Sequence, residues 1–348
     1  MYRDHEIGVV VPAYNEEGHV EGVLREIPDY VDRVYAVDDR STDDTWSEIR
    51  TAARADAAGG GLQSGGSEQT QVEEITTPSV HHRGVIYEPI GRVVPIRHHE
   101  NRGAGGAIKT GYLVALADGA DVVATVDGDG QMDLGQLPRL LDPIVEDRVD
   151  YAKGNRLAAD RNRMPAWRLF GNGILTLLTR IASGYWQLTD PQNGYTAISR
   201  AALEAIDVDE LYEYYGYCND LLVKLNVAGV RVGDVPMRPI YGDEQSNIVI
   251  TEYVPRVSAM LLRNFLWRLS VTYVRGRSGR RAAGAVAVVA ILFLVTALTS
   301  LIRNRSGRER GSVGSKVLLG ATCVALALSM GSAFDVRGDE ASVVKIDG

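Results

Sequence analysis

The chain has 348 residues, of which 45% are hydrophobic, and it carries a formal net charge of −8 at pH 7. This length suits one large domain or two ordinary ones. The acidic balance argues against a general nucleic-acid binder, which would carry a basic surface, so no nucleic acid is expected as a partner. The two cysteines, Cys218 and Cys323, give neither a disulfide framework nor a zinc-ligand spacing.

Short apolar runs alternate with helix-like stretches in the N-terminal part of the chain. The predicted strands are residues 7–11, 34–37, 93–96 and 122–126, and the predicted helices are residues 16–27, 43–57 and 103–117. Such alternation predicts an α/β fold, with a mostly parallel sheet and helices on both faces.

Residues 58–83 interrupt this rhythm. They contain Gly59–Gly61 and Gly65–Gly66 among scattered Ser, Thr and Gln, and they lack apolar periodicity. We interpret them as a flexible insertion, with a surface loop favoured over a functional lid.

The pattern changes after residue 131. A short strand is predicted at residues 150–153, followed by amphipathic helices at 165–185 and 254–274. Helices with one apolar face and Arg on the other can lie in a membrane interface, although the same faces could pack on a sheet. For the second helix the interface is favoured, and residues 251–281 are assigned to an interfacial helix.

Two further stretches, residues 282–302 and 317–334, are nearly uncharged and approach the length that spans a bilayer. Buried core helices are the alternative, but the flanking Arg clusters favour two transmembrane helices within residues 282–334, followed by a polar tail at 335–348. Both sides of the first stretch are equally basic, so the positive-inside rule does not set the orientation.

The most informative motif is the acidic sequence Asp127-Gly128-Asp129-Gly130-Gln131, which directly follows a predicted buried strand. In open α/β sheets, ligands bind beyond the carboxyl ends of the strands. Hard divalent cations take a few such oxygens together with the oxygens of a phosphate. Taken alone, the motif fits a surface turn equally well.

Polar residues also follow the first two predicted strands, at Pro12–Glu17 and Asp38–Thr45. The ends of three predicted strands would then place polar groups at one edge of the sheet. An acidic edge accepts a pyrophosphate only if a cation neutralises it, so the metal and nucleotide hypotheses support each other.

Taken together, these motifs resemble family 2 glycosyltransferases with the GT-A fold. Within that family they most resemble the polyprenyl (dolichyl) phosphate sugar synthases. Further matching pieces are Asn101–Ala107, Gly154–Arg156 and Asp190–Tyr195. The resemblance covers roughly residues 6–250, and it makes residues 1–250 the expected catalytic domain.

The resemblance also implies roles for individual residues. Substrate-binding roles fall to residues that follow the strands and to two on the 165–185 helix. These are Pro12, Tyr14, Glu16, Val37, Asp39, Gly128, Arg156, Arg168 and Asn172. Asp39 is chosen over Asp38 as the residue that hydrogen-bonds the nucleobase. A Mg²⁺ or Mn²⁺ would be held by Asp127, Asp129 and Gln131, and Arg168 with Asn172 would receive the lipid phosphate.

The expected reaction moves one sugar, with inversion, from a UDP- or GDP-linked donor to a polyprenyl phosphate. Asp127, Asp129, Arg156 and Asp190 are the expected catalytic residues. A phosphate acceptor is already anionic near neutral pH and needs positioning by Arg rather than a base. A sugar hydroxyl would need a base, and Asp190 is the candidate, which keeps elongation of a lipid-linked glycan as an alternative.

A non-catalytic membrane scaffold is a second alternative, from a different class. No Gln-x-x-Arg-Trp motif is present, which favours single transfer over processive synthesis. Arg40 stands where the family often has Gly, and Gly128 stands where Ala is frequent. The expected location is a membrane, with membrane lipid as a partner. The catalytic domain would face the cytoplasm, because the nucleotide donor is there.

Overall fold

The computed structural model describes residues 1–59, 78–156, 166–238, 250–271 and 343–346. The predicted transmembrane segments at 282–334 lie outside these residues. Among the described helices, none has the length and apolar character needed to cross a membrane.

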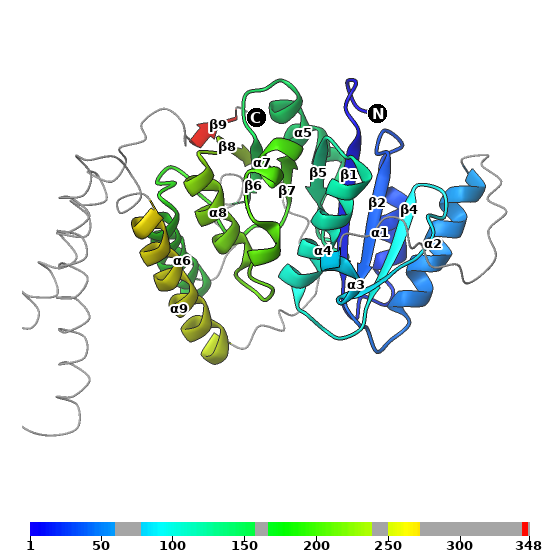
Figure 1. The fold of residues 1–348 in the computed structure, drawn as a ribbon, viewed down its shortest axis with the longest axis horizontal. Helices are drawn as coiled ribbons and strands as arrows, with labels where there is room; N and C mark the ends of the chain where they lie inside the picture. The colour runs from blue at the N-terminus through cyan, green and yellow to red at the C-terminus, as the bar shows by residue number, and fades with distance from the viewer. Residues whose placement is uncertain (60–77, 157–165, 239–249, 272–342, 347–348) are drawn as a thin grey trace, which may run out of the picture.

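A single nine-stranded sheet organises the described residues, with the order β3-β4-β2-β1-β5-β7-β6-β8-β9 (Figure 1). Its strands are β1 (Ile7–Ala13), β2 (Arg33–Asp38), β3 (Gly84–Ile86), β4 (Val93–His98), β5 (Val122–Thr125), β6 (Tyr151–Asn155), β7 (Thr196–Ser199), β8 (Val232–Pro236) and β9 (Val343–Lys345). The β4-β2-β1-β5 and β6-β8-β9 groups are parallel. β3 pairs antiparallel with β4, and β7 is antiparallel to both of its neighbours.

Helices connect the strands and cover both faces of the sheet. They are α1 (Val20–Glu26), α2 (Thr45–Gly59), α3 (Pro78–His81), α4 (Ala104–Asp118), α5 (Leu137–Val145), α6 (Ala166–Ser183), α7 (Arg200–Glu204), α8 (Tyr217–Ala228) and α9 (Ile250–Leu269), with 3₁₀ turns η1 (Leu134–Gln136) and η4 (Val208–Glu210). The predicted α/β architecture with a mostly parallel sheet is therefore confirmed.

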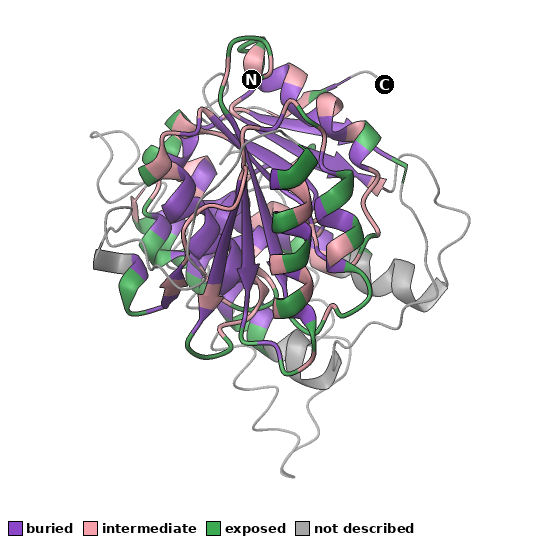
Figure 2. Ribbon diagram, turned by 90° about the vertical axis from the view of Figure 1, so that its right-hand side faces the viewer, coloured by how far each residue is buried: buried purple, intermediate pink, exposed green. Residues whose placement is uncertain are grey.

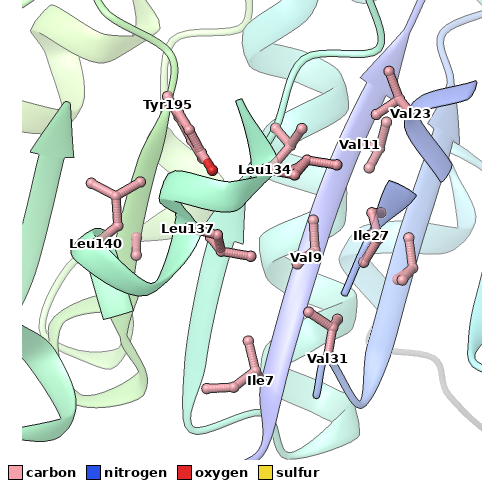
Figure 3. Close-up of a cluster of buried hydrophobic side chains, with 14 of the residues drawn as sticks. Ile7, Val9, Val11, Val23, Ile27, Val31, Leu134, Leu137, Leu140 and Tyr195 are labelled. Carbon is pink, nitrogen blue, oxygen red and sulfur yellow. The ribbon is translucent and has the colours of Figure 1, made fainter. Parts of the chain in front are cut away.

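The strand sequences bury both faces because helices lie on each side. Along β1, Val9 and Val11 belong to the core cluster under α1, α2 and α5, whereas Val10 belongs to the cluster under α4 and α8. This alternation is the period of two that a strand imposes. Figure 2 shows the central strands almost wholly buried between partly exposed helices, and Figure 3 shows Leu137 and Leu140 beside the same face of the sheet as Val9.

The helix α9 is part of this folded unit. Val257, Met260 and Leu261 are buried against Ala182 of α6 and Val223 of α8. Leu262, Leu266 and Trp267 on α9 remain between 41 and 48% exposed. The segment predicted as an interfacial helix thus has a face packed on the domain and apolar side chains that are not covered by it.

Two segments differ in detail from the sequence expectation. Within the predicted insertion 58–83, residues 60–77 lie outside the described part, but Arg83 is buried and hydrogen-bonded to α4. Within the predicted polar tail, β9 extends the sheet beside β8, and Ile346 reaches the core. Both segments contain a few residues that pair with distant parts of the chain.

Candidate active site

The carboxyl ends of β2, β1 and β5 lie side by side at one edge of the sheet, because these strands are parallel neighbours. The backbone N–H of Asp39 donates to the carbonyl of Ala13 at 2.9 Å, and that of Gly128 donates to the carbonyl of Pro12 at 3.2 Å. The loops after β2 and β5 therefore bracket the end of β1. This brings Asp39 and the aspartate motif to one place, as the pattern predicted.

The aspartate motif forms a tight turn after β5. Asp129 Oδ1 accepts the backbone N–H of Gln131 at 2.9 Å, and Gly130 has a φ of 74°, which favours glycine. Burial and the neighbouring charge of Asp129 raise the pKa of Asp127 to about 7, against the opposing effects of Arg156 and Lys153. A cation would relieve both causes, because it replaces the lost solvation and screens the second carboxylate.

The loop before β7 closes over Asp127. A Cβ on Gly194 would stand 3.1 Å from Asp127 Oδ2 and 3.3 Å from the hydroxyl of Tyr217. Beneath this loop, the ammonium of the fully buried Lys153 donates to the carbonyl of Asn193. A side chain at position 194 would therefore crowd the carboxylate of Asp127.

Arg156, at the end of β6, is held by Asp190. The guanidinium Nε donates to Asp190 Oδ2 at 2.8 Å, and Nη2 lies 3.3 Å from Oδ1. The backbone N–H of Arg156 also donates to Oδ2 at 3.3 Å. Asp190 is 2% exposed, whereas the Arg156 side chain is 40% exposed. The arrangement presents an oriented guanidinium to solvent, with its carboxylate partner below.

The two adjacent aspartates after β2 have different environments. Asp38 Oδ1 accepts the backbone N–H of Ser41, and its Oδ2 lies 2.9 Å from Arg97 Nε on β4. Asp39 Oδ1 accepts N–H groups of His98 and Arg102, while its Oδ2 is buried without a hydrogen-bond partner among the described residues. The geometry thus favours Asp39 as the residue available to a ligand.

The remaining predicted substrate-binding residues fall into three groups. Tyr14 is 46% exposed at the end of β1, and Glu16 follows it with its backbone N–H bonded to Thr45 Oγ1. Val37, near the end of β2, is fully buried in the core cluster below α4. Arg168 and Asn172 lie on the backbone of α6, but their side chains are outside the described part of the structure.

No group of three or more acidic, His or Cys side chains in the described residues is arranged to hold a metal by itself. Asp127 and Asp129 fit the other kind of site, in which Mg²⁺ takes one or two carboxylates and completes its shell with phosphate oxygens and water. The raised pKa of Asp127 agrees with such a donor set. The side chain of Gln131 could add an amide oxygen.

Several residues around the site escaped the sequence analysis. Lys153 is charged yet lies inside a strand, and a charge in a buried strand was the signal that could have identified it. Tyr215 is 53% exposed, and its pKa is raised by burial and by the charges of Glu16 and Asp127. Tyr215 therefore lies near the residues that follow β1 and β5, and the sequence alone does not indicate this proximity.

The fold and this edge, with paired carboxylates, an oriented Arg and a buried carboxylate at a second strand end, define a nucleotide-diphosphate-sugar transferase type of site. Comparison with known proteins gives the same class. Residues 85–207 match the model of the family described as Glycosyl transferase family 2. This match confirms the resemblance predicted from the motifs.

Two relatives share most of their length with this chain. The UDP-N-acetylglucosamine–dolichyl-phosphate N-acetylglucosaminyltransferase of Methanococcus voltae is 27% identical over 241 residues, which cover 68% of this chain and 87% of the relative. The undecaprenyl-phosphate mannosyltransferase of Micrococcus luteus is 28% identical over 261 residues, covering 72% and 91%.

Among solved structures, the glucosyl-3-phosphoglycerate synthase of Mycobacterium tuberculosis in complex with UDP is similar, with a TM-score of 0.48 and 20% identity. The match covers 76% of this chain and 80% of that chain.

Proposed function

We propose that this protein is a membrane-anchored, metal-dependent, inverting glycosyltransferase that moves one sugar from a nucleotide donor to a polyprenyl phosphate. The observation that carries the proposal is the gathering of Asp39, the Asp127–Asp129 pair and the Arg156–Asp190 pair around the ends of neighbouring strands. The two relatives named for dolichyl and undecaprenyl phosphate support the acceptor class.

The donor end of the site is acidic, and a bound Mg²⁺ or Mn²⁺ would supply charge stabilisation for the departing nucleoside diphosphate. Asp127 and Asp129 would hold that ion. Asp39 would accept an N–H from the base through Oδ2, which has no hydrogen-bond partner in the described part of the chain. UDP- and GDP-linked donors both carry a base with such an N–H, so both remain candidates.

A phosphate acceptor needs a cationic side chain to position it and does not need a general base. A phosphate monoester is ionised near neutral pH, so positioning its oxygen against the anomeric carbon is the main requirement. Arg156 is suited to this because its guanidinium is pre-oriented by Asp190 and remains 40% exposed on its side chain. Attack from the face opposite the leaving diphosphate would invert the anomeric centre.

A sugar hydroxyl acceptor would make Asp190 a general base. In the structure, both carboxylate oxygens of Asp190 face Arg156, and the residue is almost fully buried. A paired, buried carboxylate is poorly placed to take a proton from an incoming hydroxyl. This observation favours the phosphate acceptor.

The test uses the full chain in detergent with Mn²⁺ and a panel of radiolabelled nucleotide sugars. We expect one donor class to label bare polyprenyl phosphate, and we expect Asp129→Asn to abolish the labelling. Labelling only of a pre-formed lipid-linked sugar would favour the hydroxyl acceptor. No labelling of any lipid, together with unchanged cellular glycosylation in Asp129→Asn, would favour a scaffold.

The membrane anchor within residues 282–334 and a cytoplasmic catalytic domain are part of the same proposal. They rest on the apolar character of that stretch and on the supply of nucleotide donors in the cytoplasm. Extraction of cell membranes with alkaline carbonate should leave the full chain in the membrane fraction, whereas release into the supernatant would contradict an integral anchor.

A further inference from the structure

The carboxylate of Asp39 is oriented by a buried side chain that the proposed function does not include, namely His98 at the end of β4. His98 Nδ1 lies 2.6 Å from Asp39 Oδ1, and the exposed fractions of the two side chains are 0% and 3%. Arg102 donates its backbone N–H to the same oxygen at 2.8 Å. Two donors thus fix one oxygen of Asp39.

The other oxygen of Asp39 is the one left for a ligand. Oδ2 is buried and has no hydrogen-bond partner among the described residues. A buried carboxylate oxygen without a donor costs stability, so its persistence points to a partner that arrives with a ligand. The rotation of the carboxylate decides where Oδ2 points, and this rotation is set at Oδ1.

His98 is in turn held from behind by Thr110 on α4. Its Nε2 lies 2.8 Å from Thr110 Oγ1, which also receives Arg83 Nε at 2.8 Å and lies 3.0 Å from the carbonyl of Gly106. Both ring nitrogens of His98 are therefore engaged in buried hydrogen bonds, Nδ1 with Asp39 and Nε2 with Thr110.

This chain of contacts continues to the loop before α8. Arg83 Nη1 donates to Glu213 Oε1 at 2.6 Å, and the backbone carbonyl of Glu213 accepts the N–H of Gly106 at 2.7 Å. The ring of His98 has no freedom to turn, because its two neighbours are themselves fixed by buried hydrogen bonds. Asp39 is thereby held in one orientation before a ligand arrives.

We propose that His98 is a positioning residue for nucleobase recognition, which aims Asp39 Oδ2 at a base that carries a ring N–H, such as uracil or guanine. The inference rests on the proposed function, since it assigns the base end of that site. Loss of the Nδ1 contact would let the Asp39 carboxylate turn and would weaken the part of donor affinity that comes from the base.

Two substitutions of His98 distinguish a role in orienting Asp39 from a role in packing alone. The amide nitrogen of Asn in His98→Asn can occupy the place of Nδ1 and donate to Asp39. The longer side chain in His98→Gln places its amide nearer to the Nε2 position and keeps only the contact with Thr110. His99→Gln is the matched control, because His99 is the exposed next residue in the chain.

The experiment measures Kd by calorimetry for UDP and GDP with Mn²⁺, and for inorganic pyrophosphate with Mn²⁺, on the full chain in detergent. For the nucleotide that binds wild type more tightly, we expect His98→Gln to raise Kd by about 10- to 100-fold. His98→Asn and His99→Gln should stay within about threefold of wild type, and pyrophosphate should bind all four proteins alike.

Kinetics give a second readout. We expect His98→Gln to raise KM for the donor while leaving kcat within about threefold, because the reacting atoms are far from the base. Equal losses in His98→Asn and His98→Gln, or a matching loss of pyrophosphate binding, would show a structural role and overturn the inference. Nucleotide affinity unchanged in His98→Gln would overturn it too. Failure of wild type to bind either nucleotide would instead overturn the proposed function.

Discussion

Asp127, a predicted metal ligand, is partly buried at a cost to the stability of the folded protein. Burial and the proximity of Asp129 raise its pKa to about 7. Its pKa in the unfolded chain is about 3.9. A carboxyl group whose pKa is raised by folding destabilises the folded state only at pH values at which the group ionises. The unfavourable contribution is absent below about pH 4, grows as the pH rises, and is complete above about pH 7.

Asp127→Asn removes this cost. In the absence of divalent metal, the free energy of unfolding of the variant should exceed that of wild type by about 1–3 kcal/mol at pH 8, with little difference at pH 4. Thermal melts at the two pH values in EDTA measure this. The same variant should lose the stabilisation that Mn²⁺ with nucleotide gives wild type, and a pH-independent difference would contradict the assignment of the shift.

Substitution of Arg156 tests its proposed role in positioning the acceptor phosphate. Arg156→Lys keeps the charge but loses the planar fork that contacts both oxygens of Asp190. We expect kcat/KM for polyprenyl phosphate to fall by at least about tenfold, with the Kd for nucleotide unchanged. Arg148→Lys, at an exposed salt bridge with Glu146, is the control and should behave as wild type. An equal loss in both variants would argue against a specific role.

Arg40 occupies a backbone position that suits glycine. Its φ is 66°, and it is exposed in the turn between β2 and α2. The left-handed conformation costs a non-glycine residue about 1 kcal/mol, so Arg40→Gly should be neutral or slightly stabilising. Chemical denaturation checks this. A loss of more than about 1 kcal/mol would mean that the Arg40 side chain makes a contact that matters.

At the scale of elements, a buried carboxylate links α8, α9 and the loop that carries Tyr215. Asp220 Oδ1 accepts the side-chain amide of Asn264 at 2.6 Å. Its Oδ2 accepts the backbone N–H of Tyr212 at 3.0 Å and the ammonium of Lys224 at 2.9 Å. The position of α9 and the shape of the loop over the site therefore depend on the same side chain.

Asn264→Leu removes one of these contacts and leaves a buried carboxylate oxygen short of a donor. We expect a loss of stability of about 1–3 kcal/mol, with faster amide hydrogen exchange concentrated in α9 and residues 212–216. Arg263→Leu, one position earlier on an exposed part of the helix, is the control. Uniformly faster exchange across the whole sheet would contradict the local coupling.

At the scale of the whole molecule, local patterns in the sequence located most strands of the parallel half and the aspartate motif. They did so because buried parallel strands read as continuous apolar runs whose ends carry the polar groups. They did not reveal β7, which inserts antiparallel between β5 and β6, because strand order is set by long-range pairing. The burial of Val37 follows from its place inside β2, whose side chains are covered by helices on both faces of the sheet.

The residues missed around Asp39 have the same explanation. Arg83 lies at the end of a segment that looked like an insertion, and its partners Thr110 and Glu213 are 27 and 130 positions away. Nothing local in the sequence distinguishes such a residue from a surface Arg. The sequence motifs therefore indicated candidate ligand-binding residues, and the structure was needed to identify the residues that hold them.

The edge strand β9 has a consequence for how the protein can sit at a membrane. α9 and β9 both belong to one folded unit, because α9 packs on α6 and α8 and β9 pairs with β8. The two elements therefore lie on the same side of any membrane that the protein binds, together with the predicted catalytic edge of the sheet.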